Sequence, residues 1–187
     1  MPVNAPNNNL DMIAPSFNLL GVDDKITSLD KARGVNGTVI AFICNHCPYV
    51  KAIASRLKKE ADELLSNSIN TIAIMSNDVI DYPEDSFENM KEFSKKYNFN
   101  FPYLFDETQK VAQQYKAVCT PDLFGFDKNL KLKYRGRIDS AVMNGDKSKE
   151  ITRELFNAMI QIKETGVGPL NQINSVGCSI KWRKDES

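Results

Sequence analysis

The sequence predicts an α/β fold with a central mixed β-sheet that is flanked by helices on both faces. Residues 38–43 form a short apolar run rich in β-branched side chains, which suits a buried strand. A helical pattern begins at Cys47, and residues 69–76 are again strand-like. Because this β-α-β unit is followed by an antiparallel hairpin and a closing helix, the expected sheet is mixed.

Two antiparallel hairpins are expected. Residues 17–20 and 25–28 flank the turn-forming segment Gly-Val-Asp-Asp and give an N-terminal β-hairpin extension. Residues 122–126 and 130–135 flank Asp-Lys-Asn and give a second hairpin near the end of the sheet.

The helix after the first buried strand has a clear apolar face. Its apolar side chains recur at spacings of three and four residues, which is the helical period. These residues are Cys47, Val50, Ala54, Leu57, Ala61, Leu64 and Leu65.

Shorter elements are expected between the second buried strand and the second hairpin. The capping-box pattern Asp85-Ser-Phe-Glu88 predicts a helix that ends near Tyr97. Residues 101–105 suit a short strand. Residues 106–116 suit a short helix capped by Asp106.

The chain is expected to close with a helix over residues 147–165. The apolar face of this helix comprises Ile151, Leu155, Ala158, Met159 and Ile162.

Both chain ends are expected to be irregular around a domain that spans 14–165. Residues 1–13 are rich in Asn and Pro, and the tail 166–187 is rich in Gly, Asn and Ser. A tail of that length frays unless something holds it, so we expect it to dock on the domain through Ile180 and Trp182.

Composition and charge exclude several classes of protein. The 187 residues are 42% hydrophobic, an ordinary globular balance. Lys plus Arg and Asp plus Glu are 24 each, so no nucleic-acid or anionic-membrane partner is expected. No apolar run is long enough to span a bilayer, and the first residues lack the pattern of a secretory signal. We therefore expect a cytoplasmic protein.

Two of the four cysteines form a Cys-x-x-Cys pair, Cys44-Asn45-His46-Cys47, at the predicted strand-to-helix junction. In a cytosolic protein this placement indicates redox chemistry more than structure. A thiol at a helix N-terminus is favoured as the thiolate. We expect Cys44 to be the more exposed, attacking sulfur and the more buried Cys47 to resolve the mixed disulfide.

His46 is the only histidine and lies between the two cysteines. An imidazolium at that place stabilises a neighbouring thiolate and makes the disulfide more oxidising. The alternative is a solvent-exposed loop histidine without a role.

Asp78 is a candidate proton acceptor because it follows the second buried strand. If that strand is a parallel neighbour of the strand that precedes Cys44, both ends lie at one sheet edge, and Asp78 can exchange a proton with Cys47. A solvated loop acid is the alternative. Asp81 and Asp85 are interpreted as turn and capping residues.

Four segments of this sequence carry a family resemblance: Ala14-Pro15-Ser-Phe17, Phe42-Ile-Cys-Asn-His-Cys-Pro48, Cys119-Thr-Pro-Asp122 and Gly177-Cys-Ser-Ile-Lys-Trp182. They resemble the thioredoxin superfamily, and within it the peroxiredoxin-like (AhpC/TSA-related) bacterial proteins with a CxxC centre. The resemblance covers residues 14–165 and implies a thioredoxin-like fold. It also implies that Pro121 is cis beside the CxxC and that Thr120 offers its backbone to a peptide substrate.

The peroxidase motif of that family is incomplete in this sequence. Peroxiredoxins carry Pro-x-x-x-Thr/Ser-x-x-Cys, and an alignment on Cys47 puts Ile40 at the Pro position and Cys44 at the Thr position. No arginine stands near Thr120, where the family's activating arginine would fall, although Arg135 or Arg137 is a candidate substitute.

Cys119 and Cys178 are candidates for a second thiol pair that exchanges electrons with Cys44 and Cys47. Such a pair requires Cα atoms within about 7 Å of each other. The alternative, which a reducing cytosol favours, is two separate and inert buried thiols.

These patterns predict a thiol–disulfide oxidoreductase that needs no cofactor or metal. Its expected partners are a protein disulfide or thiol and an electron donor such as thioredoxin or glutathione. Thiol-dependent peroxide reduction through a sulfenic acid is the alternative. A second alternative is a redox-inert thiolate module for a soft metal such as Cu(I). Structural zinc is disfavoured because one cysteine pair and one histidine fall short of two close ligand pairs.

Overall fold

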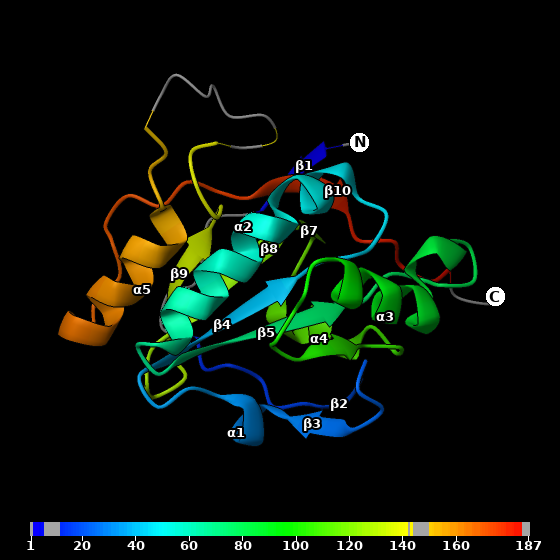
Figure 1. Ribbon diagram of the computed structural model, residues 1–187, viewed down its shortest axis with the longest axis horizontal. Coiled ribbons are helices and arrows are strands. Elements are labelled where there is room, and N and C mark those ends of the chain that lie inside the picture. The colour runs from blue at the N-terminus through cyan, green and yellow to red at the C-terminus, as the bar shows by residue number, and fades with distance from the viewer. Residues whose placement is uncertain (1, 6–11, 142, 144–149, 185–187) are drawn as a thin grey trace.

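A mixed β-sheet forms the centre of the computed structural model, which describes residues 2–5, 12–141, 143 and 150–184 (Figure 1). Its strands follow the order β3-β2-β6-β5-β4-β8-β9, and β4 pairs parallel with β5 and antiparallel with β8. The predicted mixed sheet is therefore confirmed. The strands are β2 (Asn18–Gly21), β3 (Ile26–Ser28), β4 (Gly37–Phe42), β5 (Ile69–Met75), β6 (Tyr103–Phe105), β8 (Asp122–Phe126) and β9 (Leu132–Gly136).

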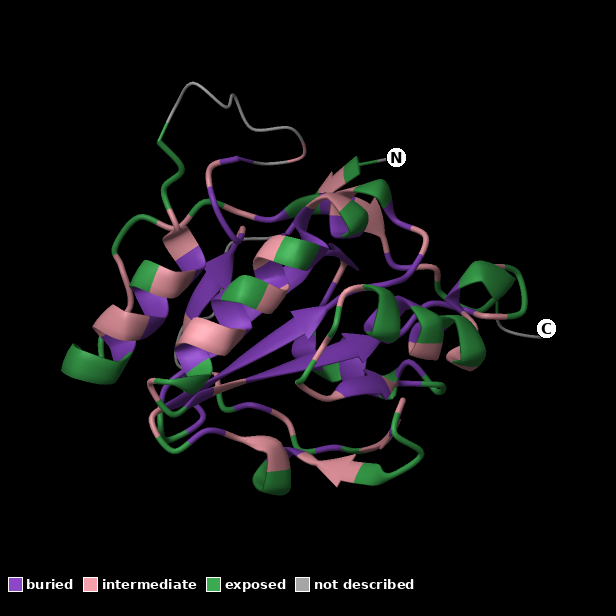
Figure 2. Ribbon diagram, in the orientation of Figure 1, coloured by how far each residue is buried: buried purple, intermediate pink, exposed green. Residues whose placement is uncertain are grey.

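Helices cover both faces of this sheet. Side chains alternate along the buried strand β4, so each face carries apolar residues that a helical layer must cover. Val39 and Ala41 belong to the apolar cluster that contains α2 (Pro48–Leu65), α3 (Phe87–Lys96) and α5 (Glu154–Thr165). Ile40 and Phe42 belong to the opposite cluster, with α1 (Leu29–Ala32) and α4 (Lys110–Tyr115). Figure 2 shows the buried strands enclosed between these layers. No helix in the described part of the chain has the length and apolarity to cross a membrane.

Two helices differ from their prediction, α2 in its buried face and α5 in its start. In α2, the predicted apolar-face residue Leu65 is 53% exposed, whereas Glu60 is buried and pairs with Arg153. The closing helix begins at Glu154, and Ile151 lies outside it. The backbone of Thr152 bonds with Ser140 instead of starting a helical turn. The predicted start at residues 147–149 lies outside the described residues.

The capping assignment at Asp85 is wrong. Asp85 ends a 3₁₀ turn, η1 (Pro83–Asp85), and its side chain is fully buried. Ser86 caps α3 instead, because its Oγ accepts the backbone N–H of Asn89 at 3.4 Å. Asp85 is therefore free to serve the neighbouring Cys-x-x-Cys loop.

Both chain ends, expected to be irregular, contribute strands to a second small sheet of order β1-β10-β7. It comprises β1 (Pro2–Asn4), β7 (Cys119–Thr120) and β10 (Val176–Ser179). Figure 1 shows β1 and β10 beside the N-terminal end of α2. Of the two expected docking residues, Ile180 is buried and Trp182 is 41% exposed. The small sheet thus brings the tail to the end of the helix that carries the Cys-x-x-Cys loop.

Candidate thiol redox site

The Cys-x-x-Cys loop connects the end of β4 to the start of α2. Pro48 is the first helical residue, a position that suits proline because that N–H has no helical acceptor. Cys47 is the N-cap, so it is Cys47 and not Cys44 that lies at the helix N-terminus. Both cysteines are 0% exposed, and the expectation of a more exposed Cys44 is wrong. All four cysteines of the chain are free thiols in this structure.

The environment of Cys47 favours its thiolate. A hydrogen bond from the Cys44 thiol is the main cause that lowers the pKa of Cys47 from its ordinary range to about 5. The Cys178 thiol and the backbone N–H groups of Val50 and Cys178 also lower this pKa, while burial opposes them. The Val50 contribution is that of a free amide in the first turn of a helix.

The Cys44 thiol has the opposite tendency. Its hydrogen bond to Cys47, its burial and the negative charge of Asp85 raise the pKa of Cys44 well above the ordinary range. Its Sγ lies 3.2 Å from the Thr120 hydroxyl oxygen. The environment therefore favours the thiolate at Cys47 and the protonated thiol at Cys44, which is the reverse of what the sequence suggests.

Thr120 and Pro121 lie against this pair, and the Thr120–Pro121 peptide bond is cis, as the resemblance implied. The Thr120 carbonyl oxygen lies 3.2 Å from Cys47 Sγ and accepts its proton when Cys47 is a thiol. In the β7–β10 ladder, Thr120 is paired with Cys178. The backbone position expected to receive a substrate peptide is therefore occupied by the protein's own C-terminal strand.

Asp85 organises the loop. One carboxylate oxygen accepts the backbone N–H groups of Asn45 at 2.7 Å and His46 at 3.2 Å. The other lies 2.6 Å from His46 Nδ1 and accepts the Asn77 side-chain amide at 2.7 Å. This role could not be predicted, because the local pattern around Asp85 is that of a helix cap and the residues it contacts are remote in sequence.

His46 is turned toward Asp85 at the edge of the site. Its side chain is 25% exposed, and its ring is stacked on Tyr82 with centroids 5.9 Å apart. Asn45 is buried and accepts the Tyr103 hydroxyl at 2.9 Å. The residues between the two cysteines are therefore fixed from both sides.

Asp78 does not occupy the place that was expected for a proton acceptor. Its carboxylate accepts the backbone N–H of Ile80 at 3.0 Å and lies 3.7 Å from Arg183. The preceding residue, Asn77, contacts the site through its side chain. Its side-chain N–H donates to Asp85, and its side-chain oxygen accepts the backbone N–H of Lys181 at 2.9 Å. The parallel pairing of β4 and β5 places the ends of both strands at one sheet edge, where Asn77, and not Asp78, contacts the residue that holds the Cys-x-x-Cys loop.

The lone cysteines are placed differently from each other. Cys178 Sγ lies 3.0 Å from Cys47 Sγ. Cys119 Sγ lies 3.6 Å from the Pro121 carbonyl oxygen, and burial raises the pKa of Cys119 far above its ordinary range. Because Cys119 is paired with Ser179, side-chain alternation turns it away from the face that carries Cys178. The thiol that contacts Cys178 is therefore that of Cys47, and not that of Cys119 as considered from the sequence.

The two arginines considered as substitutes for the family's activating arginine are engaged with carboxylates. Arg135 is buried and binds Asp122 with N–O distances of 2.7 and 3.2 Å. Arg137 binds Glu154 at 2.6 Å. Each guanidinium therefore has a structural ion pair.

One group of side chains could contact a metal ion. The ligand atoms of Cys44, His46 and Asp85 all lie within 4.8 Å of one another. This is a mixed sulfur, nitrogen and oxygen set that suits Zn²⁺ better than the soft Cu(I) considered from the sequence. Binding would have to replace the His46–Asp85 hydrogen bond.

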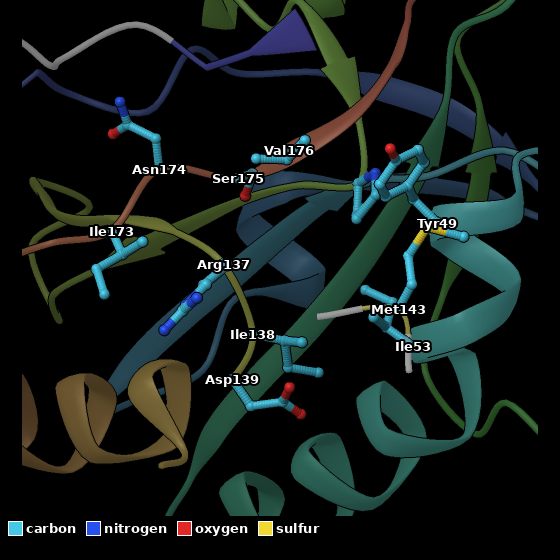
Figure 3. Close-up of a pocket in the computed structure, with 11 residues that line it drawn as sticks. Tyr49, Ile53, Arg137, Ile138, Asp139, Met143, Ile173, Asn174, Ser175 and Val176 are labelled. Carbon is cyan, nitrogen blue, oxygen red and sulfur yellow. The ribbon is translucent and has the colours of Figure 1, made fainter. Parts of the chain in front are cut away.

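A cavity of about 90 Å³ is lined by Pro121 and by residues of the first two turns of α2. Figure 3 shows Tyr49 and Ile53 of α2 on one side of this cavity and the tail segment 173–176 on the other. Its remaining lining residues are Arg137, Ile138, Asp139 and Met143. The cavity is mainly apolar, and Pro121 lies between it and the thiol site.

Comparison with known proteins is informative at the level of family and fold. The model of the AhpC/TSA family matches residues 11–135. An uncharacterized conserved protein from Geobacillus kaustophilus is 40% identical, with 98% of this chain and 97% of that chain covered and a TM-score of 0.90. A hypothetical protein from Sinorhizobium meliloti 1021 is 32% identical, with 96% and 98% covered and a TM-score of 0.89.

The fold extends to more distant proteins. The thioredoxin domain of a thiol-disulfide oxidoreductase from Bacteroides vulgatus is 15% identical, with 67% of this chain and 86% of that chain covered and a TM-score of 0.57. A search of curated proteins finds no significant match. The fold, the Cys-x-x-Cys pair and the family match agree: the chain has a thioredoxin-like fold, and it belongs to the AhpC/TSA family.

Proposed function

We propose that this protein is a thiol–disulfide oxidoreductase in which Cys47 is the attacking thiolate and Cys44 its partner. The observation that carries the proposal is the position of Cys47 at the N-cap of α2, where its pKa is lowered to about 5 next to a protonated Cys44. Thiolate attacks disulfides and thiol does not, so this asymmetry assigns the two roles.

The exchange proceeds in two displacements. The Cys47 thiolate attacks one sulfur of a substrate disulfide, a bond forms between Cys47 and that sulfur, and the other substrate sulfur leaves as a thiolate that takes a proton. Cys44 then loses its proton and attacks Cys47 Sγ, forming the Cys44–Cys47 disulfide and releasing the second substrate sulfur. Two electrons pass from the dithiol to the substrate, and the direction reverses with an oxidised protein and a thiol substrate.

The reduction potential of the Cys44–Cys47 pair follows from the lowered pKa of Cys47. Stabilising the Cys47 thiolate stabilises the reduced form, which makes the disulfide more oxidising. We propose a reduction potential above that of thioredoxin, which is about −270 mV, with a protein disulfide or thiol as substrate and a thiol such as glutathione or thioredoxin as the redox partner. Equilibration with glutathione buffers measures this potential, and a value at or below that of thioredoxin would contradict the proposed poise.

Single substitutions test the roles of the two cysteines. Cys47→Ser removes the attacking sulfur, and we expect at least about a hundredfold loss in the rate of insulin disulfide reduction. Cys44→Ser leaves the attack intact. Combined with Cys178→Ser, which removes the other thiol beside Cys47, it should accumulate covalent mixed disulfides with substrate, visible by mass spectrometry. Cys119→Ser is the matched control and should retain the wild-type rate. Mixed disulfides that accumulate on Cys47→Ser, and not on the Cys44→Ser/Cys178→Ser double variant, would reverse the assignment.

A second candidate function is thiol-dependent peroxide reduction, which the match to the AhpC/TSA family favours. Both cysteines are 0% exposed, so either substrate requires the site to open, and a peroxide requires a smaller opening than a protein disulfide. The Cys47 thiolate would attack the peroxide, giving a Cys47 sulfenic acid and an alcohol or water, and a neighbouring thiol would then form a disulfide and release water. Peroxide consumption by the reduced protein, compared with that of Cys47→Ser, distinguishes this activity from disulfide exchange.

A further inference from the structure

The C-terminal strand brings a third cysteine into contact with the redox centre. Cys178 Sγ lies 3.0 Å from Cys47 Sγ, on the strand β10 that pairs with β7. Burial and the contact with Cys47 raise the pKa of Cys178 to about 11. When Cys47 is ionised, the Cys178 thiol donates to it and helps to lower the pKa of Cys47. Cys47 therefore has two protonated thiols as neighbours, Cys44 and Cys178.

The strand that carries Cys178 is built to lie in this position. Gly177 passes so close to the cis-proline peptide that a Cβ atom there would be 2.1 Å from the Thr120 carbonyl oxygen. After β10, the backbone N–H and C=O of Lys181 bond to Asn77 and to the N–H of Asp78. Gln109 also donates to the Lys181 carbonyl at 2.7 Å. Contacts on both sides of Cys178 thus hold its sulfur against Cys47.

Exposure separates the three thiols. Cys44 and Cys47 are 0% exposed, whereas Cys178 is partly exposed. Because β10 occupies the backbone of Thr120, a substrate strand has no free pairing position beside Cys47 in this arrangement. A large thiol or disulfide partner can therefore meet Cys178 more readily than either cysteine of the Cys-x-x-Cys pair.

We propose that Cys178 is a third redox cysteine, which forms a disulfide with Cys47 and is the sulfur at which external thiols enter and leave the buried centre. This inference rests on the proposed function, because it assigns the partner-facing thiol of the same exchange reaction. The Cys44–Cys47 and Cys47–Cys178 disulfides share one sulfur and interconvert.

The interconversion is a thiol–disulfide exchange without net oxidation. Cys178 loses its proton and attacks Cys47 Sγ of the Cys44–Cys47 disulfide, a Cys47–Cys178 bond forms, and Cys44 leaves and takes up a proton. An external thiol of the glutathione class then attacks Cys178 Sγ, forms a mixed disulfide there and expels the Cys47 thiolate. A second external thiol releases Cys178, so two external thiols are oxidised to one disulfide. Cys47 suits the role of leaving group because a sulfur of low pKa leaves faster.

The first arm of the test asks whether the Cys47–Cys178 bond forms. Reduced Cys44→Ser protein is treated with glutathione disulfide and mapped by mass spectrometry of non-reduced peptides. We expect an intrachain Cys47–Cys178 disulfide with release of two glutathione molecules per chain. Glutathione adducts on separate cysteines, without an intrachain bond, would overturn the proposal. Because this variant lacks Cys44, the arm does not depend on turnover by the Cys-x-x-Cys pair.

The second arm measures how fast glutathione reduces the oxidised protein. We expect Cys178→Ser and Cys178→Ala to be reduced at least about tenfold more slowly than wild type and the control Cys119→Ser. Two different replacements guard against a folding defect, and both are compared with wild type by thermal unfolding. Equal rates in all folded variants would show that external thiols reach Cys44 or Cys47 directly and would overturn the entry role. If wild type shows no disulfide reductase activity while the Cys47–Cys178 bond still forms, the proposed function fails and this pairing stands.

Discussion

The two sides of the thiol centre are built in different ways. On the loop side, a single buried carboxylate, Asp85, fixes two consecutive backbone N–H groups and the His46 ring. On the strand side, Cys178 is held by sheet pairing of β10 with β7 and β1, which joins the two chain ends. The loop side therefore depends on one side chain, and the strand side depends on close backbone packing.

This difference bears on function. A loop fixed by a buried carboxylate keeps the positions of Cys44 and Cys47 relative to each other constant, whereas the short strand pairs of the small sheet β1-β10-β7 can open without unfolding the main sheet. In the proposed exchange, the Cys-x-x-Cys pair is therefore the fixed part, and access through Cys178 is the adjustable part. Substitutions on each side test this division.

The largest effect is expected for Asp85→Ala. The substitution leaves the N–H groups of Asn45 and His46 and the Asn77 amide without their acceptor in a buried site. Each such group costs about 1–3 kcal/mol, so we expect a loss of about 3 kcal/mol in the free energy of unfolding, allowing for water that enters the space.

Denaturant unfolding of the reduced protein measures this change. The control is Asp81→Ala, which removes an exposed ion pair with Lys184 and should cost less than about 1 kcal/mol. If both variants lose the same small amount, Asp85 is not the residue that fixes the loop.

The strand side is tested by Gly177→Ala. The added methyl group would lie 2.1 Å from the Thr120 carbonyl oxygen, so β10 must shift away from β7. We expect a loss of about 2 kcal/mol in stability, within the range for overpacking, and a lower yield of the Cys47–Cys178 disulfide. Val176→Ala on the same strand, where the side chain is 38% exposed, is the matched control and should change neither. A full yield of the disulfide in Gly177→Ala would show that Cys178 reaches Cys47 without the β10–β7 ladder.

The sequence predicts the loop side better than the strand side, for a physical reason. The strand pattern of 38–43 and the helical period after Cys47 are local, and they correctly place the Cys-x-x-Cys pair between β4 and α2. The contact of Cys178 with Cys47 depends on pairing between segments far apart in the chain, and β10 has only four residues and no alternating pattern. The role of Asp85 was missed for a related reason. The local sequence around it fits a helix cap, whereas the folded protein uses its carboxylate to hold the Cys-x-x-Cys loop.

An effect that is smaller per pH unit is expected in the pH dependence of stability. The pKa of Cys47 is lowered to about 5 in the folded protein, while an unfolded cysteine titrates near about 8.5. Between these values the folded chain has released a proton that the unfolded chain still holds. The free energy of unfolding of the reduced protein should therefore rise with pH over this window, by at most about 1.4 kcal/mol per pH unit, and the gain is lost as pH falls to about 5.

Cys47→Ser identifies the source of that slope. The raised pKa of Cys44 acts in the opposite sense only above the pKa of the unfolded thiol, so stability should be greatest near about pH 8.5. Denaturant unfolding at several pH values, with wild type and Cys47→Ser side by side, should show a slope that the substitution reduces. An unchanged slope would mean that another group releases the proton and that the Cys47 thiolate is not the stabilised form.

The smallest expected effect is that of His46→Asn on the redox potential. The amide of asparagine can still donate to Asp85, and the backbone N–H contact is kept, so the loop should retain its structure. The substitution removes a ring that lies next to Asp85 and has a nitrogen within 4.8 Å of the Cys44 sulfur. Without the ring, the negative charge of Asp85 acts more strongly against ionisation of Cys44, the reduced form loses stability, and the disulfide becomes less oxidising. We expect the potential to fall by less than about 30 mV, which is about a tenfold change in the exchange equilibrium for two electrons. Equilibration of wild type and His46→Asn in the same glutathione buffers measures the difference. A potential that rises, or that does not move, would show that the ring only positions the loop and has no electrostatic effect on the cysteines.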